Sequence, residues 1–248
     1  RFNIKKEILC PPLTQDYGLV GTTFDYLLRF YIKYLNPKAI TKQWVADSSL
    51  KLLELILEVN ELLEKRKTLK NLTFVNKELV VEKLFKMLKL IEKRYAIKNH
   101  KQKIKIIKKH YQKAIKIISN AKKKYFLFLK NGQINDNLIK STLLLAKLDP
   151  IYRAGHVTKS YNIDGKDIED LNNLISLVNP DFFKANEICL LNPIFNRASI
   201  LVGGADADLV IDDKLIDIKT TKKLQMNRNY FNQLIGYYTL YRIGGIAG

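Results

Sequence analysis

The sequence predicts a mixed α/β (α+β) fold, in which helices flank a central mixed sheet, preceded by a large, all-helical and basic N-terminal lobe. Apolar residues recur at helical spacing through most of residues 16–148. Short apolar runs bounded by Gly, Asn and Asp follow between residues 188 and 218, and another helical pattern covers 227–242. With 248 residues, 47% of them hydrophobic and 27% charged, the chain can bury a substantial core.

Asp149-Pro150 marks the predicted domain boundary, because a residue before proline is disfavoured in a helix. It separates a helical, strongly basic lobe at 1–150 from an α/β lobe at 151–248. The first helix, between Asp16 and Leu35, could pack with either lobe, and Thr22 or Thr23 is its expected N-cap. Further helices are predicted at 47–67, at 78–129 with breaks near Asn99 or Asn120, at 136–148 and at 166–178. The predicted strands are Ile188–Leu191, Ser199–Val202, Ala207–Ile211 and Leu215–Ile218.

A β-hairpin is predicted within Gly203–Thr221, where apolar and acidic residues alternate. A two-residue turn at Asp212-Asp213 would set its register, whereas a longer loop would change it. With the short turn, the expected cross-strand neighbours are Ile211 with Lys214, Asp208 with Asp217, and Asp206 with Lys219. Three carboxylates and one amine would then share a face of the hairpin.

Carboxylates gathered in this way stay ionised together only if a cation or a shared proton compensates their charge. A hard divalent ion such as Mg²⁺ or Mn²⁺ is the simplest explanation, because it prefers oxygen ligands. The alternative is a surface ribbon, in which Asp208 is a solvated edge residue and Lys219 protects the sheet edge from pairing.

The hairpin resembles the core motif of the PD-(D/E)XK nuclease superfamily. Asp208 matches the first acid of the motif and Asp217-Ile218-Lys219 matches its (D/E)-x-K, with Asp in place of the commoner Glu. Asp206 is the alternative first acid. Gln233 and Tyr237, four apart on the last predicted helix, are similar to the Gln-x-x-x-Tyr motif of the RecB-like branch. Glu187 resembles in position the upstream acid of that branch, so the resemblance covers roughly residues 150 to 248.

The resemblance implies a restriction-endonuclease-like core and a metal-dependent deoxyribonuclease, by analogy an exonuclease. Its implied metal ligands are Asp208, Asp217, the backbone carbonyl of Ile218, and Glu187. Lys219 would orient or deprotonate the attacking water, or stabilise the charge of the transition state. Gln233 and Tyr237 would position the helix or contact the nucleic-acid backbone, and the alternative is packing of an aromatic helix face.

The net charge of +19 lies outside the predicted site. Residues 151–248 contain 11 basic and 11 acidic residues, so residues 1–150 carry all of it. The segment Lys93–Lys124 holds thirteen Lys or Arg and no acid, which favours a surface that binds a phosphate backbone over a merely solvated helix face. Its candidate contacts with nucleic acid are Lys101, Lys105, Lys108 and Lys109.

The predicted function is therefore that of a nuclease acting on DNA, with RNA as a possible substrate. The alternatives are a ribonuclease or sequence-specific endonuclease on the same fold, a catalytically inactive nucleic-acid-binding module, and a helical adaptor for an acidic protein. Two distant cysteines and three histidines predict no iron–sulfur cluster and no zinc site. Without an apolar stretch long enough to cross a membrane, a soluble, cytoplasmic location is expected. The chain could be a part of a longer protein.

Overall fold

The computed structural model describes residues 2–3, 9–41, 43–64, 77–221 and 225–246. Two compact units interleave along the chain and are described separately. The sheet unit comprises residues 1–42, 125–139 and 164–248, and the helical unit comprises residues 43–124 and 140–163. Both therefore cross the boundary predicted at residue 150, and the first helix belongs with the sheet.

A four-stranded mixed sheet lies at the centre of the sheet unit, with strand order β2-β3-β4-β5. The strands are β2 (Ile40–Thr41), β3 (Cys189–Leu191), β4 (Leu209–Ile211) and β5 (Lys214–Ile216). β2 runs parallel to β3, and the other neighbours are antiparallel. A separate antiparallel pair joins β1 (Phe2–Asn3) to β6 (Gln225–Met226). Mixed α/β architecture is thereby confirmed.

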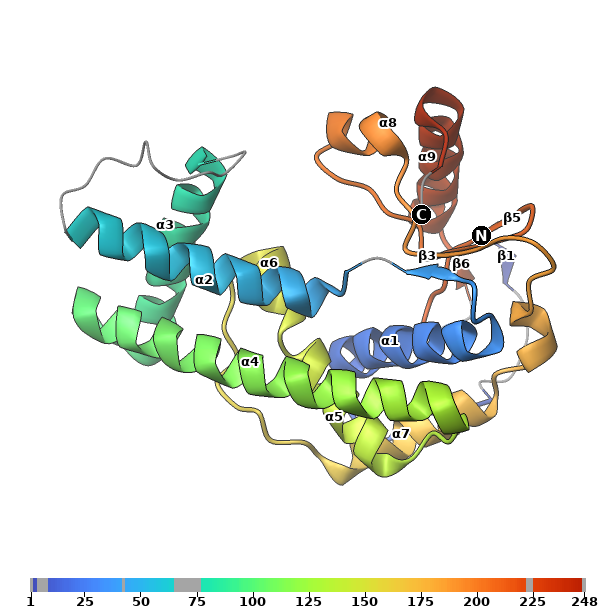
Figure 1. Ribbon diagram of the computed structural model, residues 1–248, viewed down its shortest axis with the longest axis horizontal. Coiled ribbons are helices and arrows are strands. Elements are labelled where there is room, and N and C mark those ends of the chain that lie inside the picture. Colours follow the sequence, from blue (N-terminus) through green and yellow to red (C-terminus); the bar gives the residue numbers. More distant parts are fainter. Residues whose placement is uncertain (1, 4–8, 42, 65–76, 222–224, 247–248) are drawn as a thin grey trace. The chain divides into compact units, whose positions relative to one another are not determined.

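Helices cover both faces of the sheet (Figure 1). On one face, Leu28 and Ile32 of α1 (Tyr17–Leu35) form a core with Leu209 and Ile211 of β4. On the other, Leu215 of β5 meets α8 (Asn196–Leu201) and α9 (Arg228–Gly244). The unit also contains α7 (Gly165–Ser176) and the 3₁₀ helix η2 (Pro180–Phe183). Alternate residues of the hairpin therefore enter two different cores, as a period of two requires.

Two local predictions for this unit are wrong. Asp16, not Thr22 or Thr23, caps α1 by accepting a 3.2 Å hydrogen bond from the Leu19 backbone N–H. Thr23 lies buried within the helix and donates its hydroxyl to the Leu19 carbonyl at 2.7 Å. The run Ser199–Val202 is not a strand, because α8 covers Ser199 to Leu201.

The helical unit contains α2 (Val45–Glu64), α3 (Lys77–Tyr95) and α6 (Asp149–Ala154). α4 (His100–Asn131) and α5 (Asp136–Ala146) each contribute residues to both units. Ser49 of α2 donates to the Leu148 carbonyl at 2.8 Å and accepts from the Tyr152 N–H at 3.2 Å, which fixes α2 to α6. The predicted break near Asn99 separates α3 from α4, whereas α4 continues through Asn120.

Pro150 is the second residue of α6, a new helix that begins at Asp149 after α5 has ended at Ala146. Proline is tolerated in a first helical turn because the N–H it lacks would have no partner there. Among the described residues, no helix is both long enough and apolar enough to cross a membrane.

Candidate metal and nucleic-acid site

The hairpin at the centre of the candidate site has the register that the short turn predicts. Ile211 pairs with Lys214, and the ladder ends at Leu209–Ile216. Asp212 adopts a left-handed conformation (φ 51°) in the turn, and its carboxylate accepts hydrogen bonds from the N–H groups of Asn186, Glu187 and Ile188. These donors lower the pKa of Asp212. The turn is therefore held to the entry of β3 by side-chain as well as main-chain bonds.

Asp208 lies just before β4, where the hairpin ladder has already ended. Its Oδ2 atom accepts a 2.7 Å hydrogen bond from the backbone N–H of Ile218, so it bonds across the hairpin beyond the last paired residues. Partial burial raises the pKa of Asp208 to about 6; the bond from Ile218 opposes the rise, and the charges of Asp25 and Asp217 add to it. The charges of two further acids thus act on a half-buried carboxylate.

Asp217 and Lys219 contact each other on the segment after β5. The Lys219 ammonium lies 2.7 Å from both carboxylate oxygens of Asp217, whose side chain is only 5% exposed. Partial burial lowers the pKa of Lys219, but the hydrogen bond and charge of Asp217, with the charge of Asp208, outweigh it and leave the pKa raised. The ammonium also lies 5.8 Å from the ring centroid of Tyr230 on α9. The structure therefore brings the predicted Asp, Asp and Lys together.

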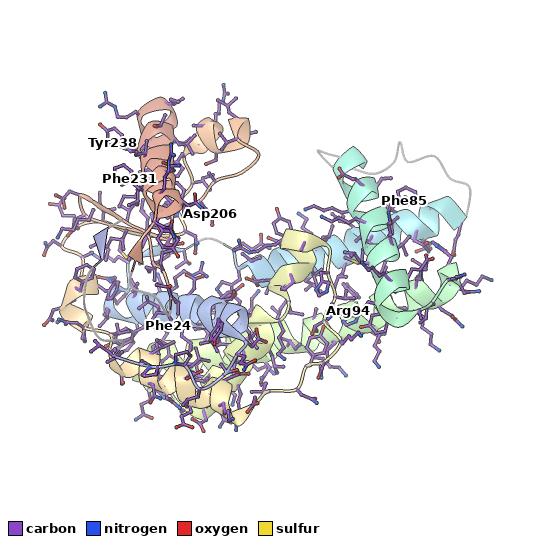
Figure 2. All side chains as sticks on the ribbon, turned by 180° about the vertical axis from the view of Figure 1, so that it is seen from behind. Phe24, Phe85, Arg94, Asp206, Phe231 and Tyr238 are labelled. Carbon is purple, nitrogen blue, oxygen red and sulfur yellow. The ribbon has the colours of Figure 1, made fainter. Side chains whose placement is uncertain are left out.

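Gln233 and Tyr237 form a bonded pair on the sheet-facing side of α9. Gln233 Nε2 donates to the Tyr237 hydroxyl at 2.6 Å, and the Tyr237 ring stacks on Phe195 at 5.5 Å between centroids. Burial raises the pKa of Tyr237, the bond from Gln233 opposes this, and the charges of Asp208 and Asp217 add to it. Other α9 residues, Phe231 and Tyr238, are exposed by 56% and 59% (Figure 2). Tyr237 thus lies near the acids and also packs in the core, while Gln233 holds its hydroxyl.

Asp25 of α1 is a site residue that the sequence interpretation did not single out. Its charge acts on Asp208, and it forms an ion pair with Arg29 one turn further along α1. Arg29 also donates to the Asn192 side-chain oxygen, and Asn192 Nδ2 lies 3.4 Å from Asp206 Oδ2. An Asp and an Arg four residues apart are common on solvated helices, so the spacing carried no specific signal.

Asp206 and Glu187 take different positions from those that the resemblance suggests. Asp206 forms a bridge with Ile194, outside the ladder that β4 makes with β5. Glu187 precedes β3 at the turn end of the hairpin, whereas Asp208 lies beside Asn192 at the other end of β3. At about 3.3 Å per residue these two places are roughly 17 Å apart along the strand. The structure therefore does not bring Glu187 to Asp208 and Asp217.

The donors that remain are the two carboxylates and the carbonyl of Ile218. In the described ranges, no group of three or more His, Cys, Asp or Glu side chains is placed to hold a metal ion. Mg²⁺ is commonly bound through only one or two carboxylates, with water completing its coordination. The donor chemistry of Asp208 and Asp217 fits such an ion, and the ammonium of Lys219 supplies positive charge at Asp217.

The predicted nucleic-acid contacts lie on α4, within the helical unit. Lys101, Lys105, Lys108 and Lys109 are all exposed there. Ile107, Ala114 and Ile118 form the buried side of the helix, whereas Ile115 is 42% exposed. Lys103 is buried and pairs with Glu92. The basic surface that the sequence predicts is thus present on the exposed side of α4.

Comparison of the chain with protein-family models, with curated proteins and with solved structures gives no match.

Proposed function

We propose that the chain is a divalent-metal-dependent nuclease that hydrolyses phosphodiester bonds in DNA, on a restriction-endonuclease-like core. The observation that carries the proposal is the meeting of Asp208, Asp217 and Lys219 beside the hairpin. An acid whose pKa is raised by burial, and further by neighbouring acids, is costly to the fold, and such groups cluster at functional sites.

Asp208, Asp217 and the Ile218 carbonyl would hold Mg²⁺ or Mn²⁺. When bound, the ion polarises the phosphodiester and lowers the pKa of a coordinated water. The hydrogen bond from Ile218 to Oδ2 fixes the orientation of the Asp208 carboxylate and leaves Oδ1 and the second lone pair of Oδ2 for a ligand. Positioning of this kind removes the reorganisation that a mobile carboxylate would require.

Lys219 supplies a positive charge beside both acids. Its raised pKa keeps it protonated near neutral pH, so its role is to donate hydrogen bonds to a phosphate oxygen or to the attacking water. The hydroxyl of Tyr237, held by Gln233, would contact the nucleic-acid backbone from α9. Lys101, Lys105, Lys108 and Lys109 would bind backbone phosphates, without reading the base sequence.

The test is cleavage of end-labelled linear DNA, covalently closed circular DNA, and RNA of the same sequence, each in Mg²⁺, Mn²⁺ or EDTA. The proposal expects cleavage of DNA with either metal and none in EDTA. Cleavage of linear DNA alone identifies an exonuclease, and cleavage of RNA alone identifies the ribonuclease alternative. Binding of DNA without cleavage in any condition would support the inactive binding module instead.

A further inference from the structure

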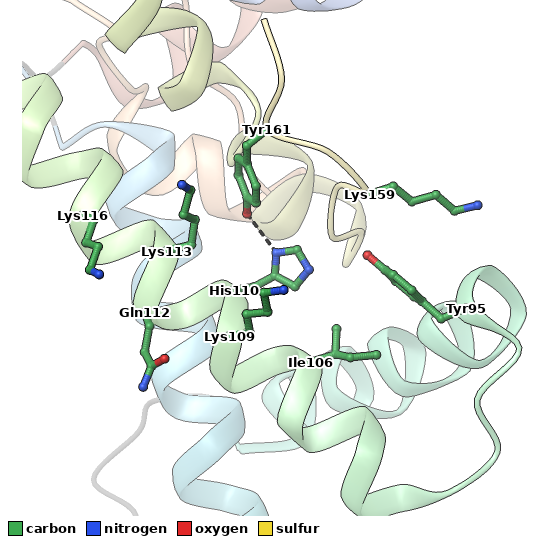
Figure 3. Close-up of a pocket in the computed structure, with 9 residues that line it drawn as sticks. All are labelled: Tyr95, Ile106, Lys109, His110, Gln112, Lys113, Lys116, Lys159 and Tyr161. Carbon is green, nitrogen blue, oxygen red and sulfur yellow. Dashed lines mark hydrogen bonds between the residues drawn. The ribbon is translucent and has the colours of Figure 1, made fainter.

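A cavity of about 460 Å³ lies within the helical unit, formed by α4, the end of α3 and the loop after α6 (Figure 3). Four lysines line it: Lys109, Lys113 and Lys116 from α4, and Lys159 from the loop. The spacing of four and three residues puts the first three on one side of α4. Its volume is in the range of about 300–1,000 Å³ that is usual for small-molecule sites.

The lysines of this cavity carry charge that no acid of the described chain neutralises through an ion pair. Lys103 and Lys122, on the same helix, do form such pairs, with Glu92 and Asp47 respectively. Like charges around one cavity repel each other unless an anion enters. Positive charge that no ion pair neutralises is therefore gathered around one cavity, and this gathering points to an anionic ligand.

The rest of the cavity wall is formed by three aromatic rings, those of Tyr95, His110 and Tyr161, together with Ile106 and Gln112. His110 is buried, and its Nδ1 atom lies 2.9 Å from the Tyr161 hydroxyl (Figure 3). Burial lowers the pKa of His110 to about 4, and the charges of Lys109 and Arg94 add to this effect, so the ring is neutral. Tyr95 donates its hydroxyl to the Thr158 carbonyl at 3.2 Å. The Lys113 ammonium lies 5.7 Å from the centroid of the Tyr161 ring, so a cation already lies over one face of that ring. The Tyr95 ring is a second flat surface beside the lysines.

We propose that this cavity binds a phosphorylated nucleotide, with its phosphate on the lysines and its base against Tyr95 and Tyr161. Ammonium groups form strong charge-assisted hydrogen bonds with phosphate oxygens, and stacking of a base on an aromatic side chain adds affinity for any base. The ligand is either a free mononucleotide or the phosphorylated end of a strand. The site lies in the helical unit and uses neither Asp208 nor Asp217, so it goes beyond the proposed nuclease activity.

The experiment is isothermal titration calorimetry of the full chain in EDTA and about 50 mM salt, conditions in which no metal-dependent cleavage occurs. The probes are AMP, adenosine, ribose 5-phosphate, and a tetrathymidylate with a 5′-phosphate or a 5′-hydroxyl. We expect AMP to bind at least tenfold more tightly than adenosine and several-fold more tightly than ribose 5-phosphate. A tenfold preference for the phosphorylated tetranucleotide over both its 5′-hydroxyl form and AMP identifies the strand end as the ligand, and equal or tighter binding of AMP identifies the free nucleotide.

Two variants distinguish AMP binding in this cavity from a general attraction of anions to a basic chain. Lys113→Gln/Lys116→Gln changes two exposed side chains of the cavity, and it should weaken AMP binding at least tenfold. The control is Lys140→Gln, which replaces an exposed lysine of the same unit that does not line the cavity. It should change the affinity for AMP less than twofold. Equal affinity for AMP and adenosine, equal affinity for AMP and ribose 5-phosphate, or wild-type affinity in the double variant would each overturn the proposal. Because cleavage is not measured, failure of the nuclease proposal leaves this test intact.

Discussion

The Asp208 carboxylate accepts a 2.7 Å hydrogen bond from the backbone N–H of Ile218, and this bond continues the hairpin beyond its last paired residues. It fixes Asp208 next to the segment that carries Asp217 and Lys219. The bond opposes the rise in the pKa of Asp208 but does not cancel it, because burial and the neighbouring acids act more strongly. Ionisation of Asp208 therefore lowers the free energy of unfolding of the metal-free protein.

That cost predicts how stability depends on pH. The pKa of Asp208 is raised from 3.8 to about 6, so its favourable contribution is complete below about pH 4 and is lost as the pH rises through 6. The loss amounts to about 2–3 kcal/mol at pH 7.5. We expect Asp208→Asn to be more stable than the wild type in urea unfolding at pH 7.5 in EDTA, and the difference to vanish near pH 4. A difference that stays constant with pH would contradict the raised pKa.

His110 should show the opposite dependence. Its pKa is lowered from 6.5 to about 4, so its contribution to stability is present above pH 6.5 and is lost as the pH falls through 4. The direct measurement is an NMR titration of the ring protons, assigned by comparison with His110→Gln. We expect no shift change for His110 between pH 8 and about 5.5. A midpoint near 6.5 would mean that the ring is solvated and not buried.

Two glycines of α9 make a matched pair for its packing on α8. A Cβ atom at Gly244 would lie 2.4 Å from the Phe195 carbonyl oxygen and 2.9 Å from Ala198 Cβ, whereas one at Gly236 meets nothing within 4 Å. Gly244→Ala should destabilise the fold by about 1–3 kcal/mol through overpacking. Gly236→Ala should be neutral or stabilise it by up to about 1 kcal/mol, since Ala favours helix. Thermal unfolding compares the two, and equal effects would argue against this contact.

The sequence predicted the hairpin well because its determinants are local. Alternation of apolar residues and a two-residue turn are enough to specify which residues pair, and Ile211 does pair with Lys214. The strand predicted at Ser199–Val202 is wrong for a physical reason. Ile200, Leu201 and Val202 are 76%, 78% and 57% exposed, so their apolar character does not indicate a buried strand. An apolar pattern predicts a strand only where its side chains are buried, and the apolar side chains of this segment are mostly exposed.

The composition of the site was less predictable because it depends on contacts between distant segments. Glu187 was expected near the acids, but the antiparallel register of β3 and β4 puts it at the turn end of the hairpin. Asp25 comes to the site only because α1 packs on the sheet, so closely that a Cβ atom added at Gly21 would lie 3.7 Å from Thr220 Cβ. No spacing within α1 reveals that packing.

The basic surface of α4 predicts a salt-dependent affinity for DNA. Replacing Lys101, Lys105, Lys108 and Lys109 by Gln removes four exposed charges. For double-stranded DNA each lost phosphate contact should reduce the slope of log K against log salt by about 0.9. Fluorescence anisotropy between 50 and 200 mM salt measures that slope. An unchanged slope would show that the phosphates bind elsewhere, and would favour a protein partner for this surface.

The central claim is that Asp208, Asp217 and Lys219 hydrolyse DNA with a divalent metal. Its most direct test is the cleavage rate of linear DNA in Mn²⁺ for the wild type, Asp217→Asn and Lys219→Ala, with DNA affinity measured on the same samples in EDTA. Asp213→Asn, in the exposed turn at the other end of the hairpin, is the matched control. We predict that the two site variants lose at least 100-fold in rate and less than threefold in affinity, while the control cleaves like the wild type. Wild-type cleavage by Asp217→Asn and Lys219→Ala would contradict the account.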